Sequence, residues 1–365
     1  MTAPARTPID IAEVVHMLSA RADVLARELL PNGRLDGREW RCGSLDGEPG
    51  QSLAVHIGGT RPGVWCDFST GESGDALDLV AAALFGNDKR AAFRWALGWL
   101  GIERLDPAAL DRRRRQVAAQ AAKLDKRDAE AAERKRRTAL RFFLEAEAQI
   151  AGTAVDLYLK GRAIDLGLLG RQPRALRFHP SLTYKWRPAG GPKSADPDAG
   201  RSFPAMVAAI MGPDGQMISL HRTYLVQTGR GYSKAPVKEP KMTLGEFRGG
   251  LISLWRGASG KPLRDAPPDD TVVIAEGIEN GLSVAVKRPD CRVLAAISLA
   301  NLANVRLPPQ LTNIVIAADN DPAADQVDAL NRAAWRLEDE GRSVRIARAP
   351  ADYKDMNDWL RGIRK

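Results

Sequence analysis

The first hundred residues change from helical to strand-like patterning and back. Apolar residues recur at helical spacing over residues 11–29, and a Pro-Asn-Gly turn then ends that pattern. Over residues 40–68 short runs alternate apolar and polar positions between turns rich in Gly and Pro, which predicts a small β unit. A further helix is predicted after Asp75. We place a first domain at residues 1–104.

A segment of helical composition follows. Residues 106–150 are rich in Ala, Arg, Lys, Glu and Gln and contain no Gly or Pro after Pro107. One straight helix of this length, at about 1.5 Å per residue, would reach roughly 65 Å. We therefore expect a bend or a helical hairpin, and we define residues 105–150 as a basic helical linker.

Strand patterns dominate the next segment, residues 151–265. The apolar runs 203–211 and 216–226 flank a Gly-Pro-Asp-Gly sequence, which predicts a β-hairpin. This segment is the third predicted part of the chain.

Strands and helices alternate in residues 266–365. The expected strands are 271–275, 292–297, 313–317 and 343–347, and the expected helices are 279–287 and 323–340. Continuous apolar strands alternating with helices predict a parallel sheet covered on both faces, an α/β domain. The whole chain is thus predicted to be an α+β multidomain protein.

The composition excludes several classes of protein. The chain has 365 residues, of which 44% are hydrophobic and 27% charged, values typical of a folded multidomain protein. No apolar run approaches the roughly 18 residues that span a bilayer. Three distant cysteines exclude a disulfide framework. We expect a cytoplasmic protein without membrane contact.

Charge is unevenly distributed along the chain. Residues 151–265 carry 18 basic and 8 acidic side chains, a net charge of +10, whereas residues 266–365 carry 13 and 15, a net charge of −2. This contrast predicts a surface for a polyanion next to a carboxylate site, and the alternative is a solvated surface rich in arginine.

Acidic residues follow the predicted strands of the C-terminal domain. Glu276 ends the first strand, Asp319 and Asp321 follow the third, and Asp355 and Asp358 follow the last. Ligands bind at the carboxyl ends of such strands, so we expect these acids to converge. Clustered oxygen ligands are typical of Mg²⁺ or Mn²⁺ sites. The alternative, that each acid caps a helix, applies best to Asp321.

These motifs resemble the Toprim domain of primases, topoisomerases and some nucleases. The resemblance rests on Ile274-Ala275-Glu276-Gly277, Ala318-Asp319-Asn320-Asp321-Pro322 and Lys354-Asp355-Met356-Asn357-Asp358. Upstream, residues 158–164 and 176–180 are similar to the start of the polymerase core in DnaG-type bacterial primases. The N-terminal segment is similar to the zinc ribbon of that family.

The sequence departs from that family at its zinc ligands. The family's Cys-x-x-His and Cys-x-x-Cys pairs are reduced here to Cys42, followed by Leu45, and Cys66, followed by Ser69. A structural zinc site normally has four ligands, so we expect a degenerate ribbon without zinc. Its expected core is Trp40, Val55, Trp65 and Phe68.

Two asparagines also depart from the family. Asn280 and Asn357 stand where aspartates are common, which weakens the predicted metal set without abolishing it. The family's helicase-binding domain is expected to be missing as well, because the chain ends soon after the last Toprim motif. A phage, plasmid or other mobile element is therefore the expected context.

The resemblance implies a primase-like nucleotidyltransferase that makes short RNA primers on single-stranded DNA. It implies Glu276, Asp319 and Asp321 as catalytic residues that, with Asp355, hold Mg²⁺ or Mn²⁺. It implies nucleoside triphosphates and a single-stranded DNA template as partners, with a replicative helicase as a further partner. The residues expected to meet phosphates are Arg162, Arg222, Lys234, Lys241 and Lys354.

Two other functions stay open at this stage. The first is a Toprim nuclease or topoisomerase. A topoisomerase would need a strand-passing domain, for which the sequence has no room. A nuclease of the overcoming-lysogenization type would need an ATPase P-loop, and residues 257–262 lack its length and its hydroxyl residue. The second is a non-catalytic protein that binds single-stranded nucleic acid.

Overall fold

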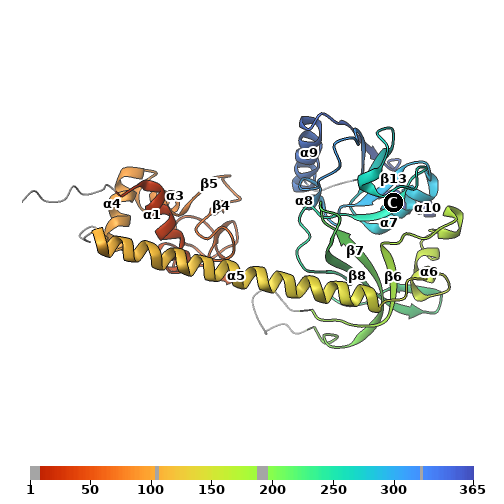
Figure 1. The fold of residues 1–365 in the computed structure, drawn as a ribbon, viewed down its shortest axis with the longest axis horizontal. Helices are drawn as coiled ribbons and strands as arrows, with labels where there is room; N and C mark the ends of the chain where they lie inside the picture. The colour runs from red at the N-terminus through yellow and green to blue at the C-terminus, as the bar shows by residue number, and fades with distance from the viewer. Residues whose placement is uncertain (1–8, 103–106, 187–195, 321–323) are drawn as a thin grey trace, which may run out of the picture. The chain divides into compact units, whose positions relative to one another are not determined.

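The structure is a computed structural model that describes residues 9–102, 107–186, 196–320 and 324–365. The chain divides into two compact units, Met1–Ala131 and Ala132–Trp186 with Asp196–Lys365 (Figure 1). Helices and three sheets confirm the predicted α+β class. Among the described helices, none is long and apolar enough to cross a membrane.

The first unit is a small antiparallel sheet with helices packed against it. Its strands pair in chain order. Asp75 caps α3 through a capping box, as the predicted helix start requires. The elements are α1 (Ile11–Ser19), α2 (Ala22–Leu29), β1 (Arg34–Asp36), β2 (Glu39–Cys42), β3 (Leu53–His56), β4 (Trp65–Asp67), β5 (Ser73–Gly74), α3 (Ala76–Phe85) and α4 (Lys89–Trp99).

The core of this sheet differs from the prediction at one residue. Trp40, Val55 and Trp65 are buried together, as expected. Phe68 is instead 66% exposed, because it lies beyond the end of β4, where the strand no longer turns it toward the core.

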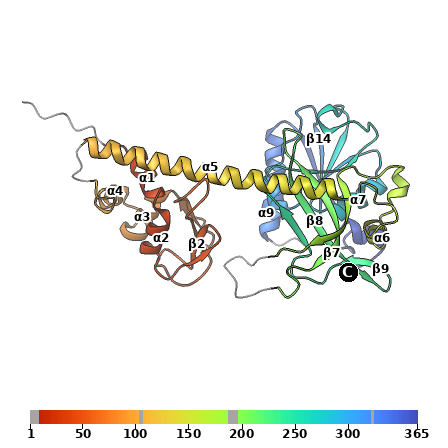
Figure 2. The ribbon, with the colours of Figure 1, turned by 60° about the horizontal axis from the view of Figure 1, so that its bottom comes forward.

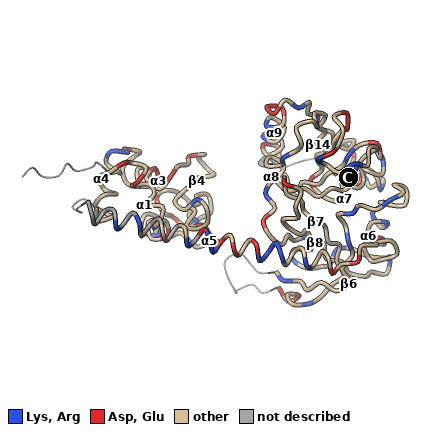
Figure 3. The backbone as a smooth tube through the Cα atoms, viewed as in Figure 1, with Lys and Arg blue, Asp and Glu red and all other residues tan. Residues whose placement is uncertain are grey.

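The linker is one helix, α5 (Pro107–Glu145), and the expected bend or hairpin is wrong. Tertiary contacts stabilise this long helix, since isolated helices depend on tertiary packing. Asp128 pairs with Arg38 in the first unit at 3.1 Å, and Ala139 is buried in a core of the second. Basic and acidic residues mix along its length (Figure 3).

An antiparallel sheet opens the second unit, and Figure 2 labels its strands β7, β8 and β9. The strand order is β10-β8-β7-β6, with β9 added to β8. The predicted hairpin is confirmed as β7 and β8. The elements are α6 (Ala154–Lys160), a 3₁₀ turn (Leu166–Leu169), β6 (Leu176–Thr183), β7 (Ser202–Met211), β8 (Met217–Thr228), β9 (Gly231–Lys234) and β10 (Lys241–Leu244).

The C-terminal sheet has the order β11-β13-β12-β14-β15, and all its pairs except β11·β13 are parallel. Helices α7 and α10 lie on one side of it and α9 on the other (Figure 1). The elements are β11 (Ile252–Arg256), a 3₁₀ turn (Leu263–Asp265), β12 (Thr271–Ala275), α7 (Ile278–Lys287), β13 (Arg292–Ala295), α8 (Leu299–Leu302), β14 (Asn313–Ala318), α9 (Ala324–Asp339), β15 (Ser343–Arg348) and α10 (Met356–Arg361).

The two predicted parts 151–265 and 266–365 are joined in this unit. Strand β11, from the first part, pairs with β13, and one core cluster contains residues of both parts. A local pattern shows that a strand exists but not which sheet it enters. The sequence therefore placed a boundary at residue 265 and did not predict that β11 pairs with β13.

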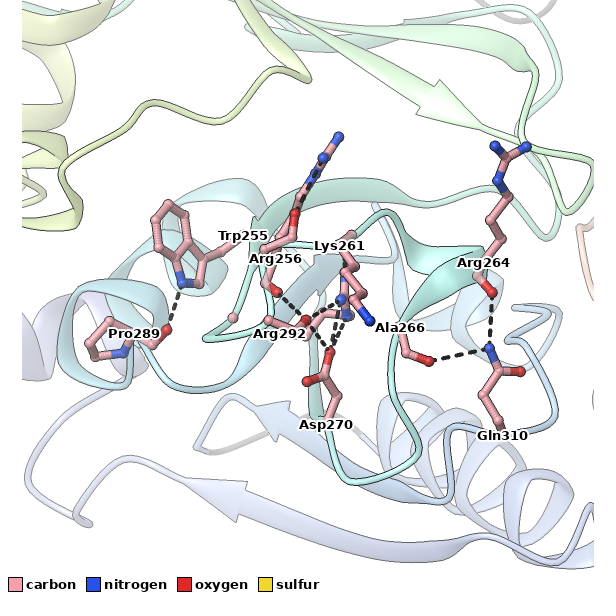
Figure 4. A network of polar contacts seen from close by, with 12 residues as sticks. Trp255, Arg256, Lys261, Arg264, Ala266, Asp270, Pro289, Arg292 and Gln310 are labelled. Carbon is pink, nitrogen blue, oxygen red and sulfur yellow. Dashed lines mark hydrogen bonds and ion pairs between the residues drawn. The ribbon is translucent and has the colours of Figure 1, made fainter.

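A buried ion pair fastens the loop after β11 to the sheet. Arg292 has no exposed surface and donates to Asp270 at 2.8 and 3.0 Å, to the carbonyl of Lys261 and to the hydroxyl of Ser259 (Figure 4). A buried guanidinium needs such partners to offset its desolvation. The stretch 257–262 therefore has a structural role in the described chain.

Candidate active site

Parallel pairing brings the predicted acids to one edge of the C-terminal sheet. Ala275 pairs with Ala317, so Glu276 and Asp319 both follow strands that end at the same edge. Asp355 reaches this edge as the N-cap of α10. All three line a cavity of about 420 Å³. Asp321 lies outside the described residues.

The cavity is lined by both carboxylates and cations. Its lining residues are Arg162, Lys234, Lys241, Glu276, Gly277, Glu279, Asn280, Ile297, Asp319, Lys354, Asp355, Asp358 and Arg361. Four of the five predicted phosphate-binding residues are thus brought together here. They come from the turn after α6, from β9, from β10 and from the segment before α10, which lie far apart in the sequence.

Burial and neighbouring carboxylates disfavour the charged forms of Glu276 and Asp319. Burial, followed by the nearby charge of Asp319, raises the pKa of Glu276 above its ordinary value. Burial and the charge of Asp355 likewise raise the pKa of Asp319. Carboxylates crowded in this way gain when a cation joins them.

The donor set therefore suits a hard divalent cation in its chemistry. Among the described residues, no group of three or more His, Cys, Asp or Glu side chains is arranged so that it could hold a metal ion. With Asp321 outside that part of the chain, the ligand set stays a prediction. Glu276, Asp319 and Asp355 are the members of it that the structure brings into one cavity.

Arg222 does not belong to this cavity, which corrects its predicted role. It is only 5% exposed and donates to Tyr224 and to the carbonyl of Thr243. Residues directly opposite on antiparallel strands share a face. Arg222 pairs with Met242, whereas its neighbour Thr223 pairs with Lys241, so Arg222 and Lys241 point to opposite faces.

The two asparagines support the site as hydrogen-bonding residues. The amide of Asn280 donates to the carboxylate of Asp319 at 2.8 Å. Asn357 is buried and donates to Ser283 and to the carbonyl of Arg162, while it accepts from the guanidinium of Arg162 at 2.6 Å. Both residues therefore orient charged groups around the cavity.

Glu279 is the main residue that the sequence reasoning missed. Its side chain accepts from Tyr158 at 2.7 Å and Lys241 at 3.0 Å, and Lys234 lies at 3.5 Å. Its position three residues after Glu276, at the start of the predicted helix 279–287, was the available signal.

The thiols of the first unit lie on opposite faces of their sheet. Cys42 pairs with Leu53, and Cys66 pairs with Ala54, the next residue of β3. Adjacent strand residues alternate in direction, so the two thiols cannot ligate one ion in this arrangement. Burial raises the pKa of Cys42 to about 11, which disfavours the thiolate that zinc requires. The absence of zinc stays a prediction.

Comparison with known proteins assigns the C-terminal domain. Residues 271–363 match the family model of the Toprim domain. These residues form a Toprim domain. This match confirms the predicted resemblance to the Toprim domain. Residues 133–254 match a second family model, described as a domain of unknown function (DUF7146). No curated protein matches the chain.

Solved structures of primases are similar to about two thirds of the chain. A DnaG primase catalytic domain bound to single-stranded DNA is 17% identical, with 64% of this chain and 76% of that chain covered and a TM-score of 0.41. The Escherichia coli primase catalytic core is 18% identical over 64% and 77%, with a TM-score of 0.37. A primase domain from Pseudomonas aeruginosa is 17% identical over 63% and 75%, with a TM-score of 0.35. The function has to be argued from the geometry of the cavity.

Proposed function

We propose that the chain is a Toprim-type DNA primase that joins nucleoside triphosphates into short RNA primers on single-stranded DNA. The observation that carries this proposal is the cavity in which the Toprim carboxylates face cations from the preceding segment. Carboxylates at the edge of the Toprim sheet suit a divalent metal, and the cations suit a chain of phosphates. Binding and joining nucleoside triphosphates would use both the carboxylates and the cations.

Glu276, Asp319 and Asp355 would hold Mg²⁺ or Mn²⁺, together with the predicted ligand Asp321. When bound, the metal would supply charge stabilisation for phosphoryl transfer. Asn280 keeps the carboxylate of Asp319 oriented through its amide. These acids serve as ligands in this proposal and not as proton donors.

The cations of the cavity wall would bind the triphosphate or the template backbone. Arg162, Lys234, Lys241 and Lys354 line the cavity. Arg162 is held in place by Asn357 and stacks over the ring of Tyr158 at 5.5 Å. Binding through such groups is independent of sequence and weakens as salt rises. A helicase partner and a mobile-element replicon stay predictions.

One assay tests the proposed function. Labelled nucleoside triphosphates are incubated with single-stranded DNA and Mg²⁺ or Mn²⁺, and the products are resolved by length. We expect short labelled RNA from the wild type. Shortened DNA without RNA synthesis would favour a nuclease, and binding without either product would favour a non-catalytic protein.

A further inference from the structure

Glu279 combines deep burial with contacts to exposed groups of the cavity wall. The residue is 5% exposed, whereas the side chains of Lys234 and Lys241 are 30% and 37% exposed. Its carboxylate lies 3.5 Å from the ammonium of Lys234 and 3.0 Å from that of Lys241. One buried acid thus holds two cations at the surface of the cavity.

The donors around Glu279 keep it ionised in spite of its burial. Burial alone would raise its pKa, but Lys241, Lys234 and the hydroxyl of Tyr158 hold the pKa well below the ordinary value. A buried carboxylate is stable only with such a set of partners. Two ammonium groups and one carboxylate leave one positive charge directed toward the cavity.

These partners come from separate segments of the second unit. Tyr158 is on α6, Lys234 on β9 and Lys241 on β10, while Glu279 is in the first turn of α7 in the Toprim domain. Lys234 pairs with Leu225 and Lys241 with Thr223, so both lysines lie on the same face of the sheet. Glu279 ties that face to the Toprim domain.

We infer that Glu279 is a positioning residue whose carboxylate fixes the ammonium groups of Lys234 and Lys241 for contact with the phosphates of a nucleoside triphosphate. This inference rests on the proposed function for the identity of the ligand. It extends that function, because it explains the positions of Lys234 and Lys241 by an acid that does not itself contact the anion.

The charge of Glu279 makes the inference easy to test, since two explanations predict opposite results. If Glu279 acted only through its negative charge, Glu279→Gln would strengthen anion binding by removing repulsion. If it positions the lysines, the same variant weakens binding, because the two ammonium groups repel each other and lose their common anchor. We expect binding to weaken by about tenfold or more.

The measurement is the dissociation constant of ATP without divalent metal, at low salt and pH 7.5, by titration calorimetry on the full chain. Glu338→Gln is the matched control, since Glu338 is exposed on α9, on the other side of the sheet. Its dissociation constant should equal that of the wild type. Thermal melting of each variant separates loss of folding from loss of binding.

Tyr158→Phe is the second variant, because it removes one hydrogen bond to Glu279 and keeps every charge. We expect ATP binding to weaken about threefold. If Glu279→Gln does not fold, this variant decides the question. Unchanged or tighter ATP binding by a folded variant would overturn the inference, as would a wild type that binds no ATP. Primer synthesis is scored separately, so a chain that binds ATP in this way but makes no primers would refute the proposed function alone.

Discussion

The antiparallel sheet of the first unit and the parallel sheet of the Toprim domain both carry residues of metal-ligating type, but only the second gathers them. In the first, Cys42 and Cys66 lie on opposite faces, because their partners on β3 are adjacent. In the second, Glu276 and Asp319 follow strands that end at one edge. A parallel sheet assembles residues that follow its strands, whereas an antiparallel ladder assembles only residues of matching register.

The largest effect is expected from Asp319→Asn, which tests the parallel side of this comparison. Primer synthesis should fall at least about 100-fold, because an amide is a poorer ligand than a carboxylate. The metal-free melting temperature should stay the same or rise, because the variant removes a charge that burial and the nearby charge of Asp355 disfavour, as the raised pKa of Asp319 indicates. Primer assays and thermal melting check both points.

Asp339→Asn, an exposed change on α9, is the control and should leave both values unchanged. Normal primer synthesis by Asp319→Asn would contradict the assignment of this carboxylate.

The next test concerns the placement of Lys241 and Arg222 on opposite faces of the sheet, here called the face rule. It compares Lys241→Met with Arg222→Met. Lys241 lines the cavity, so its variant should weaken binding of single-stranded DNA and lower the salt slope by about one. Arg222 is buried on the other face, so its variant should lower the free energy of unfolding by about 1 to 3 kcal/mol and leave the salt slope unchanged. DNA titrations at several salt concentrations and urea unfolding provide the values. Equal salt slopes for both variants would contradict the face rule.

A smaller effect is expected from the pH dependence of His221, on the cavity-facing side of β8. Burial, followed by the charge of Lys241, lowers its pKa to about 4, and Glu279, Arg222 and Lys234 are the other charged groups acting on it. His221 binds a proton near pH 6.5 in the unfolded chain and only near pH 4 in the folded chain. The stability that the neutral imidazole contributes is therefore lost as pH falls from 6.5 to 4. The loss should be about 1 to 3 kcal/mol.

His221→Gln removes this titration, so the unfolding free energies of wild type and variant should converge or cross as pH falls from 7 to 4. Other acids titrate in both proteins and cancel in the difference. A difference that does not change with pH would show that His221 is not held neutral.

The smallest effect concerns the first unit. The separation of Cys42 and Cys66 predicts that a chelator leaves the melting temperature unchanged and that elemental analysis finds no stoichiometric zinc. One zinc per chain, lost on Cys42→Ser, would show that the sheet gathers ligands after all.

The sequence by itself determined the main strands and helices of the C-terminal domain and the edge at which the acids gather. The strands that precede Glu276 and Asp319 are continuous apolar runs, and the helices between them have clear periodicity, so the parallel sheet follows from pattern alone. The β7–β8 hairpin follows from its turn residues in the same way. These strands, helices and turns could be predicted because each depends on residues that lie close together in the sequence.

Only the tertiary structure decided which side chains meet. Glu279 pairs with Tyr158, 121 residues away, and Arg222 is separated from Lys241 by the register of β8 and β10. A shift of one residue in that register would exchange the two faces, and nothing local specifies which face the Toprim domain covers. The sequence therefore determined which groups are available, and the packing of distant segments determined which of them share a cavity.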